Sequence, residues 1–291
     1  MDTMLDMIFI GLLRGGLYAL MASGLTLVLG VMNISNFAHG ELYMVGSYAA
    51  YFAGSVFGLH PLLTILIGAL AAGATGVLVE RTAFHALRTM SRDKWLTNSF
   101  LLTVGVSFIL QYSAFVIWGP TYKGVPSYWE GFVPLTPTFR LPLDRAFAFV
   151  AAVIGVSILW IFLTRTVTGK AIRAVAEDET GAMLVGINIR RMHTLTFALS
   201  CLLAGLAGAS LLPITPAQPF VGLGPLFKSY FVVILAGFGN VMGSIIGGFL
   251  IGLLETVTYY SFGAGWQNVA SLIVIMLVLL LKPTGLFGSK Q

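Results

Sequence analysis

The sequence predicts an all-α fold, a polytopic transmembrane helix bundle of about eight or nine membrane segments that include broken or half helices. Of its 291 residues, 57% are hydrophobic and only 9% are charged, whereas roughly a quarter of an ordinary soluble domain is charged. Between Ile8 and Val79 the only charged residues are Arg14 and Glu41. Water-facing surface needs charge, so we expect this stretch to face lipid. The composition therefore excludes a soluble globular protein. We expect residues 1–291 to form a single transmembrane domain.

Each expected span is an apolar run close to the roughly 20 residues that cross the hydrocarbon core as a helix. The N-terminus is acidic where a secretory signal is basic, so we expect the first run to remain as a membrane helix. The clearest run, 96–118, contains no charged residue. The expected spans are residues 7–29, 39–57, 62–79, 96–118, 145–163, 194–212 and 266–282.

The stretch 226–259 is too long for one straight span, because as a helix it would extend about 50 Å at 1.5 Å per residue. Gly237, Gly239 and Asn240 mark a natural break, since glycine tolerates unusual backbone angles. We therefore expect a short or half helix over 226–238 and a full span over 241–259.

Lysine and arginine orient the bundle, because short cytoplasmic loops collect them. Two spans separate the basic loops 80–95 and 164–193, so one orientation makes both cytoplasmic. The N-terminus is then outside and the C-terminus inside, provided that the broken stretch contributes two passes. The basic residues of the two loops are Arg81, Arg88, Arg92, Lys94, Arg165, Lys170, Arg173, Arg190 and Arg191, and the C-terminal tail adds Lys282 and Lys290.

Most of the 11 prolines lie in two loops, 119–144 and 213–225, both of which this orientation places outside. Proline stiffens such loops, and the first also carries Tyr122, Tyr128 and Trp129. These aromatic residues suit docking of an external partner, or they form the ordinary aromatic belt of a membrane protein.

The inner loop 164–193 predicts a short amphipathic helix at the cytoplasmic surface. Ala171, Val175 and Ala176 share one helical face, and the acidic triplet 177–179 favours a helix N-terminus. The small residues that follow would let the groove of another protein come close. A helix lying on the membrane surface is the alternative, although such helices usually have a basic polar face.

Two polar interruptions are candidate substrate-pathway segments. Irregular backbone at membrane depth requires surrounding protein or a water-lined cavity, and transporters often place their substrate at such breaks, in matching halves of a repeat. A faint repeat is visible here, and an ordinary inner loop is the alternative for the first interruption. The candidates are Asn33, Asn36, His39 and Glu41 in the first, and Gly237, Gly239 and Asn240 in the second.

Arg14, Gln111 and Glu255 are further polar residues within apolar spans. An ionisable group there costs about 2.5–3.5 kcal/mol on insertion scales, so we expect Arg14 to neutralise Glu41 or Glu255. His39 beside Glu41 could relay protons, or it could simply form a helix cap. Three pairs of glycines four residues apart are expected to allow close helix packing, within this chain or against another: Gly11 with Gly15, Gly243 with Gly247, and Gly248 with Gly252.

Several motifs resemble the permease subunits of ABC importers for branched-chain amino acids, nearly from end to end. The inner-loop segment 176–188 and the following Leu195-Thr196-Phe197-Ala198-Leu199 are similar to the cytoplasmic loop of that family. Further motifs are Gly24-Leu25-Thr26, Asn36-Phe37-Ala38-His39-Gly40, Glu80-Arg81 with Phe84 and Leu87-Arg88, Gly237-Phe238-Gly239-Asn240 with Gly243-Ser244, and Lys282-Pro283-Thr284-Gly285-Leu286-Phe287-Gly288. The family often has arginine where Lys282 stands, a departure of little consequence.

The resemblance implies a non-catalytic permease subunit in the inner membrane that moves its substrate by alternating access. Its implied partners are a second homologous permease, two cytoplasmic ATPase subunits, a periplasmic substrate-binding protein, an amino-acid substrate and membrane lipid. The segment 176–188 would be the helix that couples to the ATPase. The coupling residues are Glu177, Asp178, Glu179, Thr180, Gly181, Ala182, Gly186, Ile187 and Asn188.

The residues set limits on this implied role. The sequence lacks a Gly-x-x-x-x-Gly-Lys-[Ser/Thr] phosphate loop, so we expect no cofactor on this chain and ATP with magnesium on the ATPase partners. No metal site is expected from the single cysteine, and no nucleic-acid partner without a basic run. The alternatives are an ABC permease for amides, urea or aromatic acids, and a stand-alone secondary transporter or channel that uses His39, Glu41 and Glu255.

Overall fold

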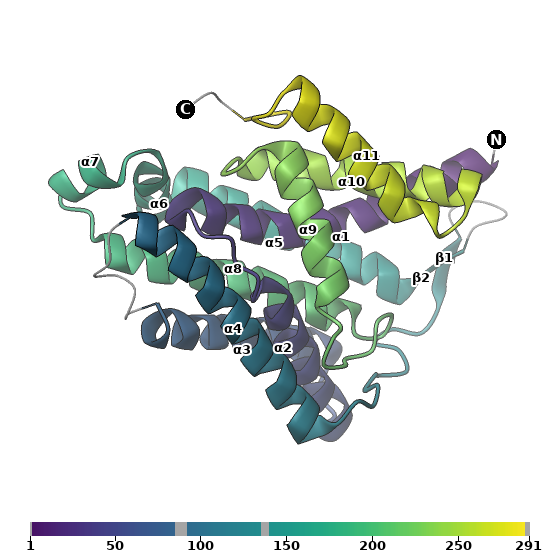
Figure 1. Cartoon of the computed structure of the whole chain (residues 1–291). Coiled ribbons are helices and arrows are strands. Elements are labelled where there is room, and N and C mark those ends of the chain that lie inside the picture. The colour runs from purple at the N-terminus through teal and green to yellow at the C-terminus, as the bar shows by residue number, and fades with distance from the viewer. Residues whose placement is uncertain (1, 85–91, 135–139, 289–291) are drawn as a thin grey trace.

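The computed structural model describes residues 2–84, 92–134 and 140–288, a helical bundle with one small hairpin (Figure 1). Arg88 and Lys290 lie outside the described residues, as do the side chains of Arg92 and Lys94. The elements are α1 (Asp2–Met32), α2 (His39–Tyr51), a π-helical turn (Phe52–Val56), α3 (Pro61–Thr82), α4 (Arg92–Trp118), β1 (Phe132–Pro134), β2 (Arg140–Pro142), α5 (Leu143–Arg165), α6 (Val167–Glu177), α7 (Glu179–Leu184), α8 (Ile189–Leu211), α9 (Leu223–Ala236), α10 (Val241–Phe262) and α11 (Trp266–Leu281).

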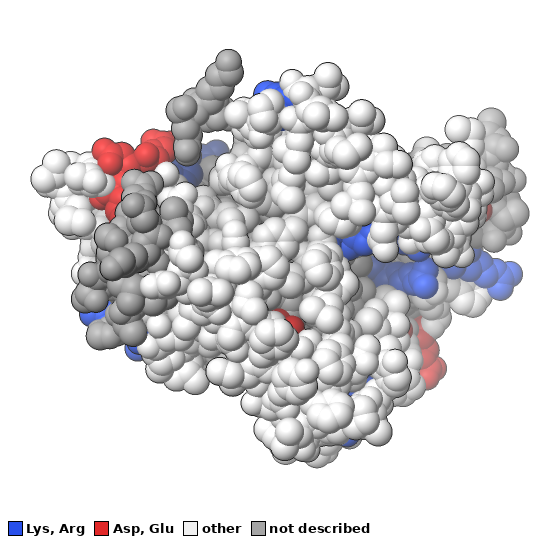
Figure 2. All heavy atoms as spheres, viewed as in Figure 1, with Lys and Arg blue, Asp and Glu red and all other residues white. Residues whose placement is uncertain are grey.

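The helices confirm the expected polytopic bundle, with boundaries shifted by a few residues. Among the described residues, α1, α3, α4, α5, α8 and α10 are long and apolar enough to cross a membrane. The expected helix 39–57 is instead α2 followed by the π-helical turn. The expected break after 238 is present, because α9 has only 14 residues and ends at Ala236, with Gly237 as its C-cap, before α10 begins. The surface in Figure 2 carries few charged side chains over most of its area, as a lipid-facing surface requires.

Each end of the bundle brings together segments that the charge pattern assigned to one side of the membrane. At one end, which we call the hairpin end, β1 pairs with β2, and Lys123 forms a β-bridge with Ala217 that joins the two proline-rich loops. At the other, which we call the α7 end, Thr194 Oγ1 donates to Glu80 Oε2 at 2.6 Å and so joins the start of α8 to the end of α3, the two helices that adjoin the basic loops. The N- and C-termini lie toward opposite ends of the bundle (Figure 1).

The fold contains an inverted repeat of long helix, short helix and long helix. The first unit is α1–α2–α3 and the second is α8–α9–α10. Helix α1 ends at the α7 end of the bundle, where Met32 O accepts from Trp95 Nε1 at 3.2 Å, whereas α8 begins there. The long helices of the two units therefore run in opposite directions. This repeat does not match the two polar interruptions with one another, because 33–38 corresponds to the α8–α9 connection, whereas 237–240 lies between α9 and α10.

The short helices α2 and α9 begin in the middle of the bundle and meet there. His39 Nε2 lies 3.1 Å from Met21 O, about 16 Å before the end of α1 at 1.5 Å per residue. A Cβ atom on Gly40 would lie 2.5 Å from Gly222 O, so the backbones at the two helix N-termini are in direct contact. The N-termini of α2 and α9 therefore lie against each other near the middle of the bundle.

Glycines also bring the long helices together. A Cβ on Gly252 of α10 would lie 2.4 Å from Gly15 N of α1, and a Cβ on Gly248 would lie 2.5 Å from Ala19 N. The expected close packing of these glycines is confirmed, and it occurs within this chain. Helices α2 and α8 make a similar approach at Gly46.

Candidate functional site

The inner loop 164–193 forms two short helices, so the prediction of a single amphipathic helix there was wrong, and the expected coupling segment 176–188 contains α7. Helix α6 ends at Glu177 and α7 starts at Glu179, because Asp178 between them is extended and its Oδ1 accepts from Thr180 N–H at 3.0 Å. A Cβ at Gly181 would lie 2.4 Å from Asp178 Oδ2. The acidic triplet therefore does mark a helix N-terminus, as expected, but it starts a second helix.

A tight reversal follows α7 and returns the chain to the bundle. Gly186 has φ +85°, and its N–H donates to Met183 O at 3.0 Å. Ile187 N–H donates to the carbonyl of the buried Ala182 at 3.0 Å, and Asn188 Oδ1 then caps α8. Because a side chain at φ +85° is strained, Gly186 is the residue that permits this turn.

The tip of α7 is an exposed apolar surface at the margin of the molecule (Figure 1). Met183, Leu184 and Val185 are 59%, 84% and 77% exposed. Acidic side chains gather at this end of the surface (Figure 2). An exposed apolar patch with a polar rim is typical of a protein-docking site.

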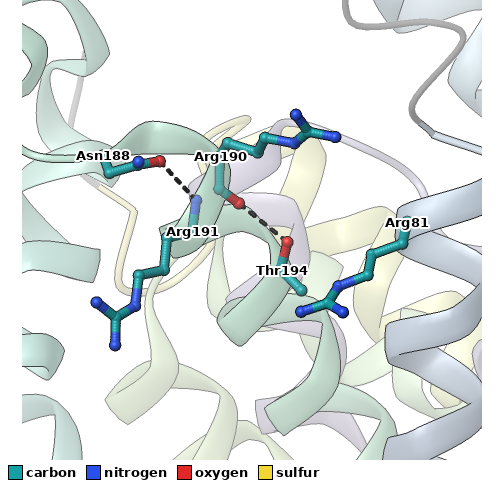
Figure 3. Close-up of a pocket in the computed structure, with 5 residues that line it drawn as sticks. All are labelled: Arg81, Asn188, Arg190, Arg191 and Thr194. Carbon is teal, nitrogen blue, oxygen red and sulfur yellow. Dashed lines mark hydrogen bonds between the residues drawn. The ribbon is translucent and has the colours of Figure 1, made fainter.

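A basic pocket of about 380 Å³ lies beside this segment, between the end of α3 and the start of α8 (Figure 3). Arg81 points toward Thr194, whose hydroxyl donates to Arg190 O at 3.0 Å, and Arg191 points away from them. The pocket adds positive charge to the α7 end of the bundle, where the charge pattern predicts the cytoplasm.

The first polar interruption, 33–38, is an extended connection that brings the chain back from the end of α1 to its middle. Asn33 is exposed and has φ 54°. Asn36 is fully buried, and its Oδ1 accepts from Ala38 N–H at 3.1 Å, which supports the start of α2. The Phe37 ring lies 5.2 Å from that of Phe100 and 5.1 Å from that of Tyr230, so α4 and α9 flank the connection.

His39 and Glu41 are both fully buried but contact different helices. His39 Nδ1 lies 3.3 Å from Ser200 Oγ of α8. Glu41 Oε1 accepts from Ser107 Oγ at 3.1 Å and from Gln111 Nε2 at 3.5 Å, both on α4. These hydrogen bonds do not link His39 to Glu41 as a proton relay would require.

Sequence reasoning noted Gln111 alone, whereas α4 presents a polar stripe toward the start of α2. Its members, Ser99, Thr103, Ser107 and Gln111, follow one another at four-residue spacing. Thr103 Oγ1 accepts from Phe37 N–H at 3.2 Å. The spacing places all four on one helical face. This four-residue spacing is visible in the sequence, but it is recognised only when the four residues are considered together.

The second interruption, at Gly237–Asn240, lies at the α7 end of the bundle. A Cβ on Gly239 would meet Gly30 Cα at 3.3 Å, near the end of α1. Asn240 Oδ1 caps α10 by accepting from Gly243 N–H at 2.8 Å, and its Nδ2 donates to Phe287 O at 2.9 Å. The C-terminal tail covers Gly237. These contacts give the three residues a role in the turn and in holding the tail.

The expected pairing of Arg14 with a buried glutamate was wrong. Glu255, which is 1% exposed, forms an ion pair with Lys228 of α9. It also accepts from Tyr18 OH at 2.8 Å and from Ser271 Oγ at 2.9 Å. The Arg14 guanidinium instead lies 5.7 Å from the centre of the Tyr259 ring. The rotation of α10 decides this outcome, because it turns Glu255 toward α9 and α11.

The described part of the loop 119–144 is ordered around Asp144 at the start of α5. Asp144 Oδ1 accepts from the backbone N–H of Tyr128 and Trp129 at 2.9 and 3.1 Å. Tyr128 OH donates to Ala209 O at 3.1 Å. Burial, and then the charge of Asp144, raise the pKa of the Tyr128 phenol above its usual range. The aromatic residues of this loop thus brace the hairpin end.

No group of three or more His, Cys, Asp or Glu side chains that could hold a metal ion is found within residues 2–84, 92–134 and 140–288.

Comparison with known proteins gives matches along almost the whole chain. The family model described as the branched-chain amino acid transport system / permease component matches residues 7–281. The high-affinity branched-chain amino acid transport system permease protein LivH of Salmonella typhimurium is 31% identical over 99% of this chain and 96% of its own length. BraD of Pseudomonas aeruginosa, which has the same description, is 31% identical over 97% of this chain and 94% of its own.

A more distant relative is the ribose import permease protein RbsC of Escherichia coli, which is 28% identical over 90% of this chain and 81% of its own length. No solved structure matches the chain.

Proposed function

We propose, on the premise that the chain belongs to the family of branched-chain amino acid transport permeases, that it is the non-catalytic membrane subunit of an ATP-driven importer for branched-chain or related amino acids. The observation that carries the proposal is the similarity to such permeases at 31% identity over 99% of the chain. The bundle, with its six span-length helices, supplies the membrane part of such an importer.

The α7 end is the face on which two cytoplasmic ATPase subunits act, one on this chain and one on a second homologous permease. The exposed tip Met183–Val185 supports this assignment, because it offers apolar contacts to a groove. Asp178, Gly181 and Gly186 hold the tip in position through the cap and the reversal. ATP and magnesium bind to those partners, which drive transport by pressing on this tip.

The hairpin end faces the periplasm, where a substrate-binding protein delivers its ligand. The basic loops that meet at the α7 end support this orientation, since the cytoplasmic side collects arginine and lysine. The protein then lies in the inner membrane with its N-terminus outside and its C-terminus in the cytoplasm. The substrate passes near the start of α2, at Asn33, Asn36, His39 and Glu41, with the turn Gly237, Gly239 and Asn240 below it.

Reconstitution of the chain with the second permease, the ATPase and the binding protein tests the proposal. We expect leucine uptake into vesicles that requires ATP and every subunit. Uptake by this chain alone, driven by a proton gradient, would instead support a secondary transporter. Amides, urea or aromatic acids, presented with the binding protein, test the alternative cargoes.

The coupling tip can be tested separately within that assembly. Leu184→Asp places a charge on a side chain that is 84% exposed, and it should abolish ATP-driven uptake without unfolding the bundle. Val167→Asp is the matched control, because Val167 is 86% exposed but starts α6 instead of lying on the tip. Equal uptake by the two variants would remove the tip from the coupling mechanism.

A further inference from the structure

The first turn of α2 carries a buried carboxylate that has no partner for one of its oxygens. Glu41 is the third residue of α2 and is fully buried. Its Oε1 is hydrogen bonded by α4, whereas Oε2 has no hydrogen-bond partner. Within the described part of the chain, the only salt bridge joins Lys228 and Glu255. Glu41 therefore keeps an acceptor that no cation among the described residues neutralises.

Glu255 shows that the chain neutralises a buried carboxylate where structure alone requires it. Both oxygens of Glu255 have donors, including the ammonium of Lys228. Ionisable groups at membrane depth are costly and are retained for a partner or a function. The contrast with Glu41 is therefore informative, because Glu255 has both a cation and a donor on each oxygen, whereas Glu41 Oε2 has neither.

A second unpartnered group of the opposite kind lies five positions earlier in the chain. Asn36 uses Oδ1 for the backbone of α2, and its Nδ2, which can only donate, is buried without a partner. It precedes the N-terminus of a half helix, where the helix dipole favours negative charge. A free acceptor and a free donor beside such a helix end suit a molecule with an ammonium group and a carboxylate.

We propose that Glu41 is the ammonium-binding residue of the translocation pathway and that Asn36 donates to the carboxylate of the same amino acid. This proposal rests on the proposed function and adds the residues that recognise the zwitterion. Before the ligand enters, Ser107 and Gln111 are positioning residues, which hold Glu41 Oε1 and leave Oε2 available.

Helix α4 covers this site and is the element that uncovers it. Of the span-length helices it has the smallest buried fraction, 22% of its apolar window. Its Thr103 Oγ1 accepts from Phe37 N–H just before α2, and its Ser107 and Gln111 donate to Glu41 in the first turn of α2. Hydrogen bonds of this kind can be exchanged for bonds to a polar substrate at little net cost, so α4 can separate from α2 as the ligand enters.

The test compares Glu41→Gln with Glu41→Asp in the complete reconstituted transporter, with leucine as the substrate. The readouts are the initial rate of uptake and the ATP hydrolysis stimulated by the binding protein. We expect E41Q to lower leucine uptake per ATP hydrolysed by a factor on the order of ten to a hundred, because a hydrogen bond to a charged group is lost. E41D keeps the charge and should retain most of the uptake.

Asn36→Asp tests the donor without removing the acceptor that supports α2. It keeps Oδ1 for Ala38 N–H but replaces the free donor with a negative oxygen, so we expect a similar loss of uptake. If the wild-type assembly does not take up leucine, the proposed function itself is rejected. If the wild type takes up leucine and either E41Q or N36D has normal uptake per ATP, the present proposal is overturned. If both E41Q and N36D lose uptake and E41D retains it, the proposal is supported.

Discussion

The ion pair between Lys228 and Glu255 offers a quantitative test of how α9 is held against α10. Lys228→Met removes the cation from a carboxylate that is 1% exposed, and the side chain of Lys228 is itself only 16% exposed. Breaking a buried pair by removing one partner costs about 3–5 kcal/mol. Tyr18 and Ser271 still donate to Glu255, so we expect a loss near the lower limit, about 3 kcal/mol.

Thermal unfolding of the purified protein in detergent measures this loss. For a chain of this size, about 3 kcal/mol corresponds to a fall in Tm of roughly 5–10 °C. The double variant Lys228→Met with Glu255→Gln should recover most of it, because replacing both charges leaves no unpaired ion. Lys170→Met, at an exposed lysine of α6, is the control and should change stability by less than about 0.5 kcal/mol.

An unchanged Tm for Lys228→Met would refute this reasoning. So would a double variant that is as unstable as the single one, because the loss would then come from packing of the lysine stem and not from the stranded carboxylate.

Three further variants test separate features of the fold. Gly222→Ala places a Cβ 1.9 Å from Gly40 O, so it should destabilise the protein by about 1–3 kcal/mol in thermal unfolding, whereas Gly224→Ala, with open space around it, should be tolerated. Asn240→Ala removes the cap of α10 and the bond to the tail, and should cost about 1–2 kcal/mol in the same assay. Wild-type stability should fall as the pH rises above 10.0, because the phenol of Tyr128 has a raised pKa in the fold and ionises first in the unfolded chain; Tyr128→Phe should lack that part of the pH dependence in denaturation curves.

The features that the sequence could predict are those set by local composition and length. The spans and the break before Asn240 depend on apolar length and on glycine, and the structure has them close to the expected residues. The side of each loop stays a prediction from the placement of charge. The acidic triplet 177–179 likewise predicted a helix N-terminus from local charge. That N-terminus belongs to α7, a second helix that Asp178 caps.

The contacts that depend on how each helix is rotated could not be predicted in this way. Lys228 and Glu255 meet because α9 and α10 fold back on one another, whereas sequence reasoning paired Glu255 with Arg14, which lies over Tyr259 instead. The polar stripe of α4 is visible in the sequence, but its partner Glu41 is known only once α2 lies against it.

The contact between Gly40 and Gly222 links the motion of the two half helices. Neither position has room for a Cβ, so we expect a displacement of α9 to move the first turn of α2, where Glu41 lies. The other end of α9 is held by the C-terminal tail, since Phe287 N–H donates to Ala236 O at 2.9 Å. Helix α9 therefore connects the α7 end of the bundle to its middle. By this route, we expect a movement that begins at the α7 end to reach the Glu41 carboxylate through α9. The packing of the long helices α1 and α10 against each other need not change.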